Sequence, residues 1–279
     1  MNMKFTVPCT CVRDAAFGCA SLGFAGNDAE VMTFAPDLQG VVLSGSYEEI
    51  LRNIPEGPFQ AGIVLFGNAG GENTFMRALQ EKVRCPFAGG GAATDSSTGE
   101  KALITGGGEA AVFLIRDDRY DISVVSENIH NDILGEHEIT MDGPRVLAAV
   151  DGVPAAKWLS EKKAELGIAE GDFEHLTLAD LNGVNAHLSC PDGIIRSGRD
   201  LCPKMTLRYL APDKVQERMQ AFYGDEHAVI FGCAGLKGIL NGPITSSGVG
   251  LFLFGEVCTF NGVSEFGNLL CSKLRAVKK

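Results

Sequence analysis

Residues 251–268 read LFLFGEVCTFNGVSEFGN, and this stretch carries the clearest fold signal in the chain. The apolar run over residues 249–254 is short and rich in β-formers, which favours a central strand over a buried helix. Gly255 interrupts the run before it resumes at residues 257–260, as glycines do at bulges and close backbone approaches. The stretch therefore predicts a core strand with an irregularity in its middle.

A hairpin and a carboxylate complete this region. Asn261 and Gly262 form the dipeptide that most readily turns a tight hairpin, and a further strand is expected over residues 269–277. Glu256 lies inside the most apolar part of the chain, where a carboxylate has to be solvated, paired or used. Two interpretations stay open: Glu256 caps backbone amides across the hairpin, or it belongs to a binding site.

The same stretch resembles the closing signature of the FIST domain family (F-box and intracellular signal transduction). That signature is an aromatic residue, Gly, Glu and an aliphatic residue, followed by a short turn and Phe-His-Asn. Residues 254–257 and 266–268 fit it, with Gly267 where the histidine is usual. Any role of that histidine does not carry over to this chain.

The N-terminal part of the chain also resembles this family. A buried strand is expected over residues 61–66, and a helix with one apolar face over residues 72–83. A second strand, residues 85–88, enters a glycine-rich turn formed by Gly89, Gly90, Gly91 and Ala92. A hairpin around residues 106–108 follows.

The middle and the C-terminal part fit the family in turn. Residues 147–155 resemble a strand that ends in Asp-Gly-x-Pro-Ala, followed by a helix over residues 155–166. Cys233 and Gly235 fit a Cys-x-Gly motif, and Lys237 takes the place of the arginine that usually follows. The resemblance covers residues 41–277. It implies an N-terminal half at residues 1–125 and a shortened C-terminal half at residues 126–279.

A repeat is visible without the family. IVLFGNAG at residues 63–70 and VIFGCAG at residues 229–235 have the same pattern. Each predicts a strand that leads through a glycine-bearing turn to a second strand and a terminal hairpin. The sequence thus predicts an α+β fold with an internal duplication, built of two related strand-helix-strand-hairpin repeats whose mixed or antiparallel sheets are packed or joined.

The two repeats are expected to differ. Four glycines and a proline break residues 236–250, so no long helix can form there. A sheet face left without its helix would favour a homodimer.

The remaining segments give weaker signals. Residues 116–142 read as a polar connector with one strand at residues 122–125, in which His130 and His137 are expected at the solvated surface. Strands are expected at residues 186–189 and 204–210, and a helix at residues 213–222.

Composition narrows the function classes. The chain has 279 residues, 45% of them hydrophobic, and a formal net charge of −11, which disfavours nucleic acid and anionic membranes as partners. It shows no signal peptide and no apolar run long enough to span a membrane. Its nine cysteines are scattered and odd in number, as in reduced cytoplasmic proteins. Cys9, Cys11 and Cys19 lie close together but lack the spacing of a zinc site, so no metal is expected.

No cofactor is predicted either. The glycine-rich turns match neither a P-loop nor a dinucleotide-binding fingerprint. Open turns that let a small ligand approach the backbone are the preferred interpretation.

The FIST resemblance implies a cytoplasmic sensory module that binds small ligands, such as amino acids, for a signalling output. Because no output domain is recognised, a signalling protein is expected to act in trans. We expect the ligand site where the loops of the two repeats converge. The expected ligand-binding residues are Gly89, Gly90, Gly91, Ala92, Gly232, Cys233, Lys237, Gly255, Glu256 and Asn268.

Two other functions stay open. One is an enzyme with Cys233 as nucleophile, for which Lys237 and His227 are the only local partners. His227 precedes the strand that Cys233 ends, which separates the two by roughly 20 Å, so no catalytic residue is assigned. The other is a structural subunit of an oligomer.

Overall fold

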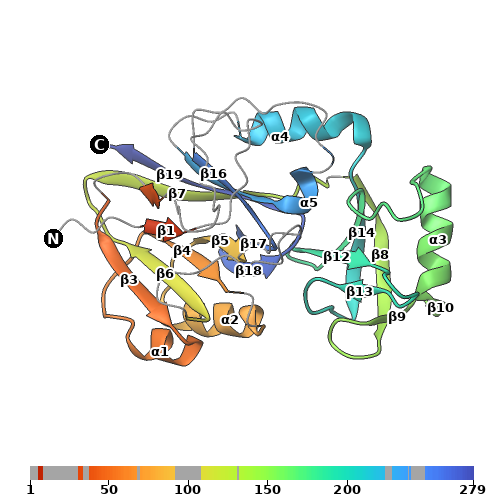
Figure 1. Ribbon diagram of the computed structural model, residues 1–279, viewed down its shortest axis with the longest axis horizontal. Coiled ribbons are helices and arrows are strands. Elements are labelled where there is room, and N and C mark those ends of the chain that lie inside the picture. The colour runs from red at the N-terminus through yellow and green to blue at the C-terminus, as the bar shows by residue number, and fades with distance from the viewer. Residues whose placement is uncertain are drawn as a thin grey trace.

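The computed structural model describes residues 6–8, 31–33, 38–67, 70–91, 108–130, 132–223, 228–237, 239 and 249–279. These residues form three large sheets and a short antiparallel pair, β1 (Thr6–Pro8) with β2 (Val31–Thr33) (Figure 1). Helices and mixed or antiparallel sheets occur together, which confirms the predicted α+β class.

A six-stranded sheet contains the strand expected at residues 61–66, and the helix expected at residues 72–83 packs on it. Its order is β18-β17-β5-β4-β6-β3, with only β4 and β5 parallel. Its strands are β3 (Gly40–Gly45), β4 (Ala61–Phe66), β5 (Phe87–Gly91), β6 (Ala110–Ile115), β17 (Glu256–Phe260) and β18 (Val263–Gly267).

Helices α1 (Tyr47–Arg52) and α2 (Glu72–Lys82) cover the outer face of this sheet. A capping box explains where α1 begins: the Ser46 side chain accepts the backbone N–H of Glu49, and the Glu49 carboxylate accepts that of Ser46. Helix α2 buries Phe75, Met76 and Leu79 against the sheet. Its apolar spacing is the one that predicted a helix over residues 72–83.

A four-stranded sheet contains the second expected strand-turn motif. Its order is β16-β15-β19-β7, with β15 (Ala228–Cys233) parallel to β16 (Val249–Leu253). Strands β19 (Cys271–Lys278) and β7 (Tyr120–Glu127) complete it in antiparallel pairings. The order β16-β15-β19-β7 repeats β5-β4-β6-β3 with the same strand directions. An internal duplication stays a prediction that this correspondence supports.

These two sheets pack face to face between layers of helices. Ile63 and Phe113 of the six-stranded sheet share a core with Phe231 and Leu274 of the four-stranded sheet. The outer face of the four-stranded sheet packs on helix α4 (Val215–Tyr223), which follows a 3₁₀ turn at Pro212–Lys214, and on the four-residue helix α5 (Ala234–Lys237). The result is a helix–sheet–sheet–helix sandwich.

A seven-stranded antiparallel sheet forms a lobe to one side of this sandwich (Figure 1). Its order is β10-β9-β8-β14-β11-β12-β13, and helix α3 (Ala155–Leu166) packs on it through Trp158 and Leu159. The strands are β8 (Asp132–Met141), β9 (Leu147–Val150), β10 (Val153–Pro154), β11 (Leu176–Ala179), β12 (Asn185–Ser189), β13 (Arg196–Ser197) and β14 (Lys204–Tyr209).

Several sequence-based expectations hold. Helix α3 has the predicted bounds, and the strand at residues 61–66 is β4. Asn261 and Gly262 take φ values of 51° and 80° in the β17–β18 hairpin, as an Asn-Gly turn requires.

The proposed boundary at residue 125 falls inside β7, and β17 and β18 lie in one sheet with β4 and β5. The two halves therefore interleave.

Other expectations are wrong. Residues 116–142 are not a connector, because they contain the whole of β7 and of β8. His130 is fully buried, and His137 lies against Trp158 and 2.6 Å from an Asp151 oxygen, so neither is a solvated surface residue.

The glycines of residues 89–91 form no open turn but lie inside β5, where all three are buried. A Cβ at Gly89 would lie 1.9 Å from the backbone oxygen of Val64, and one at Gly90 would lie 2.2 Å from that of Gly255. These glycines allow close strand packing.

The argument for a homodimer also changes. The outer face of the four-stranded sheet was expected to be bare, yet α4 buries Val215, Met219 and Phe222 against it. The homodimer stays a prediction without that argument. Among the described helices, none is both long and apolar enough to cross a membrane.

Candidate functional site

A cavity of about 730 Å³ lies where the three large sheets approach one another. The sandwich contributes the end of β15 with the start of α5, the β16–β17 connection, and the turn after β18. The lobe contributes His187 of β12 and Gly198 just after β13. Small-molecule sites typically have this size and lie at such junctions.

Three of the expected site residues line this cavity: Cys233, Gly255 and Asn268. Glu256 follows Gly255 and is buried next to Cys233, and Gly232 is buried in β15. These predicted residues lie at or beside the cavity, and their binding of a ligand stays a prediction.

The remaining expected residues either do not line the cavity or lie outside the described part of the structure. Gly89, Gly90 and Gly91 do not line the cavity, because they pack β5 against its neighbours. Ala92, His227 and the side chain of Lys237 lie outside the described part of the structure, as do Cys9, Cys11 and Cys19.

Cys233 ends β15 with its side chain almost fully buried. Burial raises the pKa of the thiol well above its ordinary value, and the nearby backbone N–H groups of Leu269 and Gly235 oppose this only in part. Leu269 holds its N–H in place with a φ of 53°, a left-handed conformation that is strained for a leucine. Cys233 therefore lines the cavity as a thiol and not as a thiolate.

Glu256 is fully buried. Its Oε2 accepts the backbone N–H of Leu270 at 3.2 Å, whereas Oε1 has no hydrogen-bond partner of normal geometry among the described residues. Burial raises the pKa of this carboxyl well above its ordinary value, which favours its protonated form. The bond to Leu270 fits the interpretation in which Glu256 caps an amide, but it accounts for only one of the two oxygens.

Asn268 and His187 form the opposite wall. The Asn268 side-chain oxygen accepts the backbone N–H of His187 at 3.4 Å, and its backbone N–H donates to the Asn185 carbonyl at 3.0 Å. A Cβ at Gly198 would lie 2.4 Å from the Asn268 oxygen, so only glycine fits there. Burial lowers the pKa of His187, and its Nδ1 is buried without a partner among the described residues. A neutral imidazole therefore lines the cavity with an unsatisfied nitrogen.

Charged residues that sequence reasoning missed complete the lining. Glu72, at the first turn of α2, is buried and lies 3.7 Å from an Arg145 nitrogen. Arg145 also contacts Asp200 at 3.0 Å, so its charge is already balanced. Glu174 lines the cavity with a carboxylate that accepts only the backbone N–H of Phe173 among the interactions described. A glycine-rich stretch before an acidic helix start was a signal for Glu72, whereas nothing local in the sequence marks Arg145 or Glu174.

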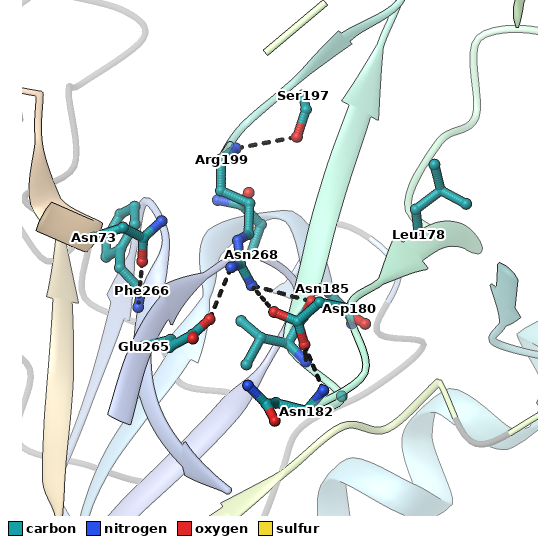
Figure 2. A network of polar contacts seen from close by, with 12 residues as sticks. Asn73, Leu178, Asp180, Asn182, Asn185, Ser197, Arg199, Glu265, Phe266 and Asn268 are labelled. Atoms are coloured by element: carbon teal, nitrogen blue, oxygen red, sulfur yellow. Dashed lines mark hydrogen bonds and ion pairs between the residues drawn. The ribbon is translucent and has the colours of Figure 1, made fainter. Parts of the chain in front are cut away.

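Buried polar side chains fix the lobe against the sandwich. Arg199, next to Gly198, is 2% exposed and lies between two carboxylates, Asp180 at 2.9 Å and Glu265 of β18 at 2.8 Å. Figure 2 shows this pairing beside Asn268. Arg199 therefore links one wall of the cavity to the six-stranded sheet.

His130 supports a second wall. Its Nε2 lies 2.8 Å from the backbone oxygen of Glu174, and its Nδ1 lies 3.4 Å from the Asn185 side-chain nitrogen. Burial lowers the pKa of His130 to about 4, so the ring is neutral, donates through Nε2 and accepts through Nδ1. This arrangement holds Glu174 at the cavity.

Two further findings bear on the site. Within the described residues, no group of three or more His, Cys, Asp or Glu side chains is placed to hold a metal ion. A comparison with protein-family models gave no match, and a search of curated proteins found no similar sequence.

Proposed function

We propose that this chain is a cytoplasmic binding module for small polar metabolites with an amino group, amino acids above all, and that a separate signalling protein responds to the bound state. The observation that carries the proposal is the cavity of about 730 Å³, which brings Cys233, Gly255 and Asn268 together with charged groups from the lobe. The FIST resemblance supports the same function.

The charges at the cavity favour a ligand cation. Glu72 and Glu174 contribute two carboxylates, whereas the single Arg145 is shared with Asp200. His187 is neutral at physiological pH, and burial favours the protonated form of Glu256. A ligand ammonium group would balance the partly buried Glu174, because hydrogen bonds between opposite charges are stronger than those between neutral groups.

Neutral polar side chains at the cavity favour a ligand that also carries hydrogen-bond donors and acceptors. Asn268 and His187 both line the cavity, and the buried Nδ1 of His187 has no hydrogen-bond partner among the described residues. An amino acid, with an ammonium and a carboxylate on one carbon, can use both kinds of partner. The odd number of scattered cysteines supports a reducing compartment such as the cytoplasm.

A thermal-shift panel of amino acids, simple amines and carboxylic acids tests this proposal. A ligand that binds only the folded state stabilises it by about 2.7 kcal/mol at a hundred times its Kd. We expect amino acids to raise the melting temperature and carboxylic acids without an amino group to have little effect. No rise with any amine or amino acid would refute the proposal.

Matched variants localise the binding. Glu174→Gln removes one charge from the cavity and should weaken ligand binding about tenfold or more, the loss expected for one charge-assisted hydrogen bond. Glu170→Gln removes the same charge from an exposed position four residues earlier and should leave the affinity unchanged. Equal affinities for the two variants, measured by titration calorimetry, would show that the ligand binds elsewhere.

A further inference from the structure

Phe254 is an exposed aromatic residue in the most apolar stretch of the chain. Its exposed fraction is 53%, whereas the neighbouring Leu253 is buried, and both residues line the cavity of about 730 Å³. A single exposed apolar side chain on a protein surface is ordinary and needs no explanation. An exposed ring that also lines a ligand-sized cavity is different, because a bound ligand can cover it and remove its apolar surface from water.

Hydrogen bonds to β5 fix the backbone that carries this ring. The Phe254 N–H donates to the Gly91 carbonyl at 3.0 Å, and the Gly91 N–H donates to the Gly255 carbonyl at 2.9 Å. Gly255 has a φ of 84°, and a Cβ there would lie 2.2 Å from the Phe266 ring, so this turn requires glycine. The backbone at Phe254 is therefore in place before a ligand arrives, and binding does not have to order a loop.

The lining of the cavity has an apolar side and a polar side, which come from different parts of the fold. The large apolar side chains all belong to the sandwich: Leu253, Phe254, Phe266 and Leu269. The lobe contributes polar and charged side chains: Arg145, Glu174 and His187. A ligand that satisfies both sides has a charged end toward the lobe and an apolar end toward the sandwich.

We propose that the ligand is an amino acid with a large apolar side chain, leucine being the simplest example, and that Phe254 selects it by contacting that side chain. This inference rests on the proposed function, because the amino group must bind at the same cavity. The ligand ammonium faces Glu174, and the ligand side chain covers the Phe254 ring. A polar side chain of the same size would lose water there and gain no hydrogen bond from the apolar side chains.

Leucine and asparagine are the probes, because their side chains branch at the same carbon and differ mainly in polarity. Titration calorimetry on the whole protein should give a Kd for leucine that is lower than the Kd for asparagine by about tenfold or more. Alanine lacks the branched end and should also bind about tenfold or more weakly than leucine, since one missing methylene in an apolar pocket already has an effect of that size.

Variants of Phe254 assign the selection to its ring. Phe254→Ala should weaken the binding of leucine about tenfold or more and leave the binding of alanine unchanged. Phe254→Tyr keeps the ring and should behave as the wild type. Ile133→Ala is the matched control, because it removes a similarly exposed apolar side chain, 59% exposed, from β8 outside the cavity, and should change neither affinity.

A second measurement does not depend on affinity. Leucine with labelled methyl groups should give nuclear Overhauser effects to aromatic ring protons of the wild-type protein, and these should weaken in Phe254→Ala. Because more than half of the Phe254 side chain is exposed, this variant should keep the melting temperature of the ligand-free wild type. If it does not fold, the comparison of leucine with asparagine on the wild type still decides the ligand class.

Two outcomes would overturn the inference and leave the proposed function intact. The first is a wild-type protein that binds leucine and asparagine equally well. The second is a folded Phe254→Ala protein that binds leucine as tightly as the wild type does. Binding of no amino acid at all would overturn the proposed function together with this inference, so the two failures are distinguishable.

Discussion

Replacing Arg199 with methionine tests how the lobe is held against the sandwich. The guanidinium Nη1 donates to Asp180 at 2.9 Å and to the Val184 carbonyl at 3.2 Å, and Nη2 donates to Glu265 at 2.8 Å. Arg199→Met leaves two largely buried carboxylates without their cation. Breaking a buried ion pair in this way costs about 3–5 kcal/mol, a large part of a stability of about 5–15 kcal/mol.

Unfolding in urea, followed by circular dichroism, measures the loss of free energy, and calorimetry should show a melting temperature lower by about 10 °C. Arg196→Met is the matched control, because Arg196 pairs with Asp192 at the surface and should contribute only about 0–1 kcal/mol.

A triple variant tests the reason for the loss. Arg199→Met combined with Asp180→Asn and Glu265→Gln removes the cation and both charges, so most of the stability should return. Asparagine keeps the oxygen of Asp180 that accepts the N–H groups of Asn182 and Val184. The reasoning is refuted if Arg199→Met loses less than about 1 kcal/mol, or if the triple variant is no more stable than the single one.

Three further predictions concern packing, pH and redox state. Gly89→Ala places a Cβ 1.9 Å from the Val64 backbone oxygen and should destabilise the fold by about 3 kcal/mol or more in denaturant unfolding; an unchanged midpoint would contradict the close strand packing. His130 has a folded pKa of about 4 against an ordinary 6.5, so its stabilising effect is complete above 6.5 and is lost as the pH falls toward 4, because the unfolded state takes up the proton first. Between neutral pH and about pH 4, the wild type should therefore lose about 3 kcal/mol more stability than His130→Gln, and equal losses would disprove this origin. All nine cysteines should react as free thiols in denaturant without reductant, and a count of seven or fewer would contradict the prediction.

The sequence predicts most of the sandwich and, in the lobe, α3, β12 and β14, but it misses β8 and β11 for physical reasons. Strands buried on both faces, such as β4, read as continuous apolar runs, and α2 shows a clear helical period. Strand β8 carries charged residues and a glycine and is mostly exposed where its side chains are described, so it gives no alternating apolar pattern. Strand β11 has only four residues and cannot show a period.

The sequence likewise predicts only some of the residues of the candidate site. Gly255 and Asn268 flank strands of the sandwich, and a polar or glycine residue at a strand end is visible in the sequence. His187, Glu174 and Arg145 reach the cavity only because the lobe docks beside it, which no local pattern encodes. The glycines of β5 misled the interpretation because tight strand packing and open turns demand the same residue.

The pairing of β5 with β17 has a consequence for synthesis of the chain on the ribosome. Gly89 and Gly90 pair with Val257 and Glu256, and the whole lobe is translated between them. Until β17 emerges, β5 is an apolar edge that a second nascent chain could join. We expect slow folding that completes only after translation, a need for chaperones during that interval, and no stable product from chains terminated before residue 256.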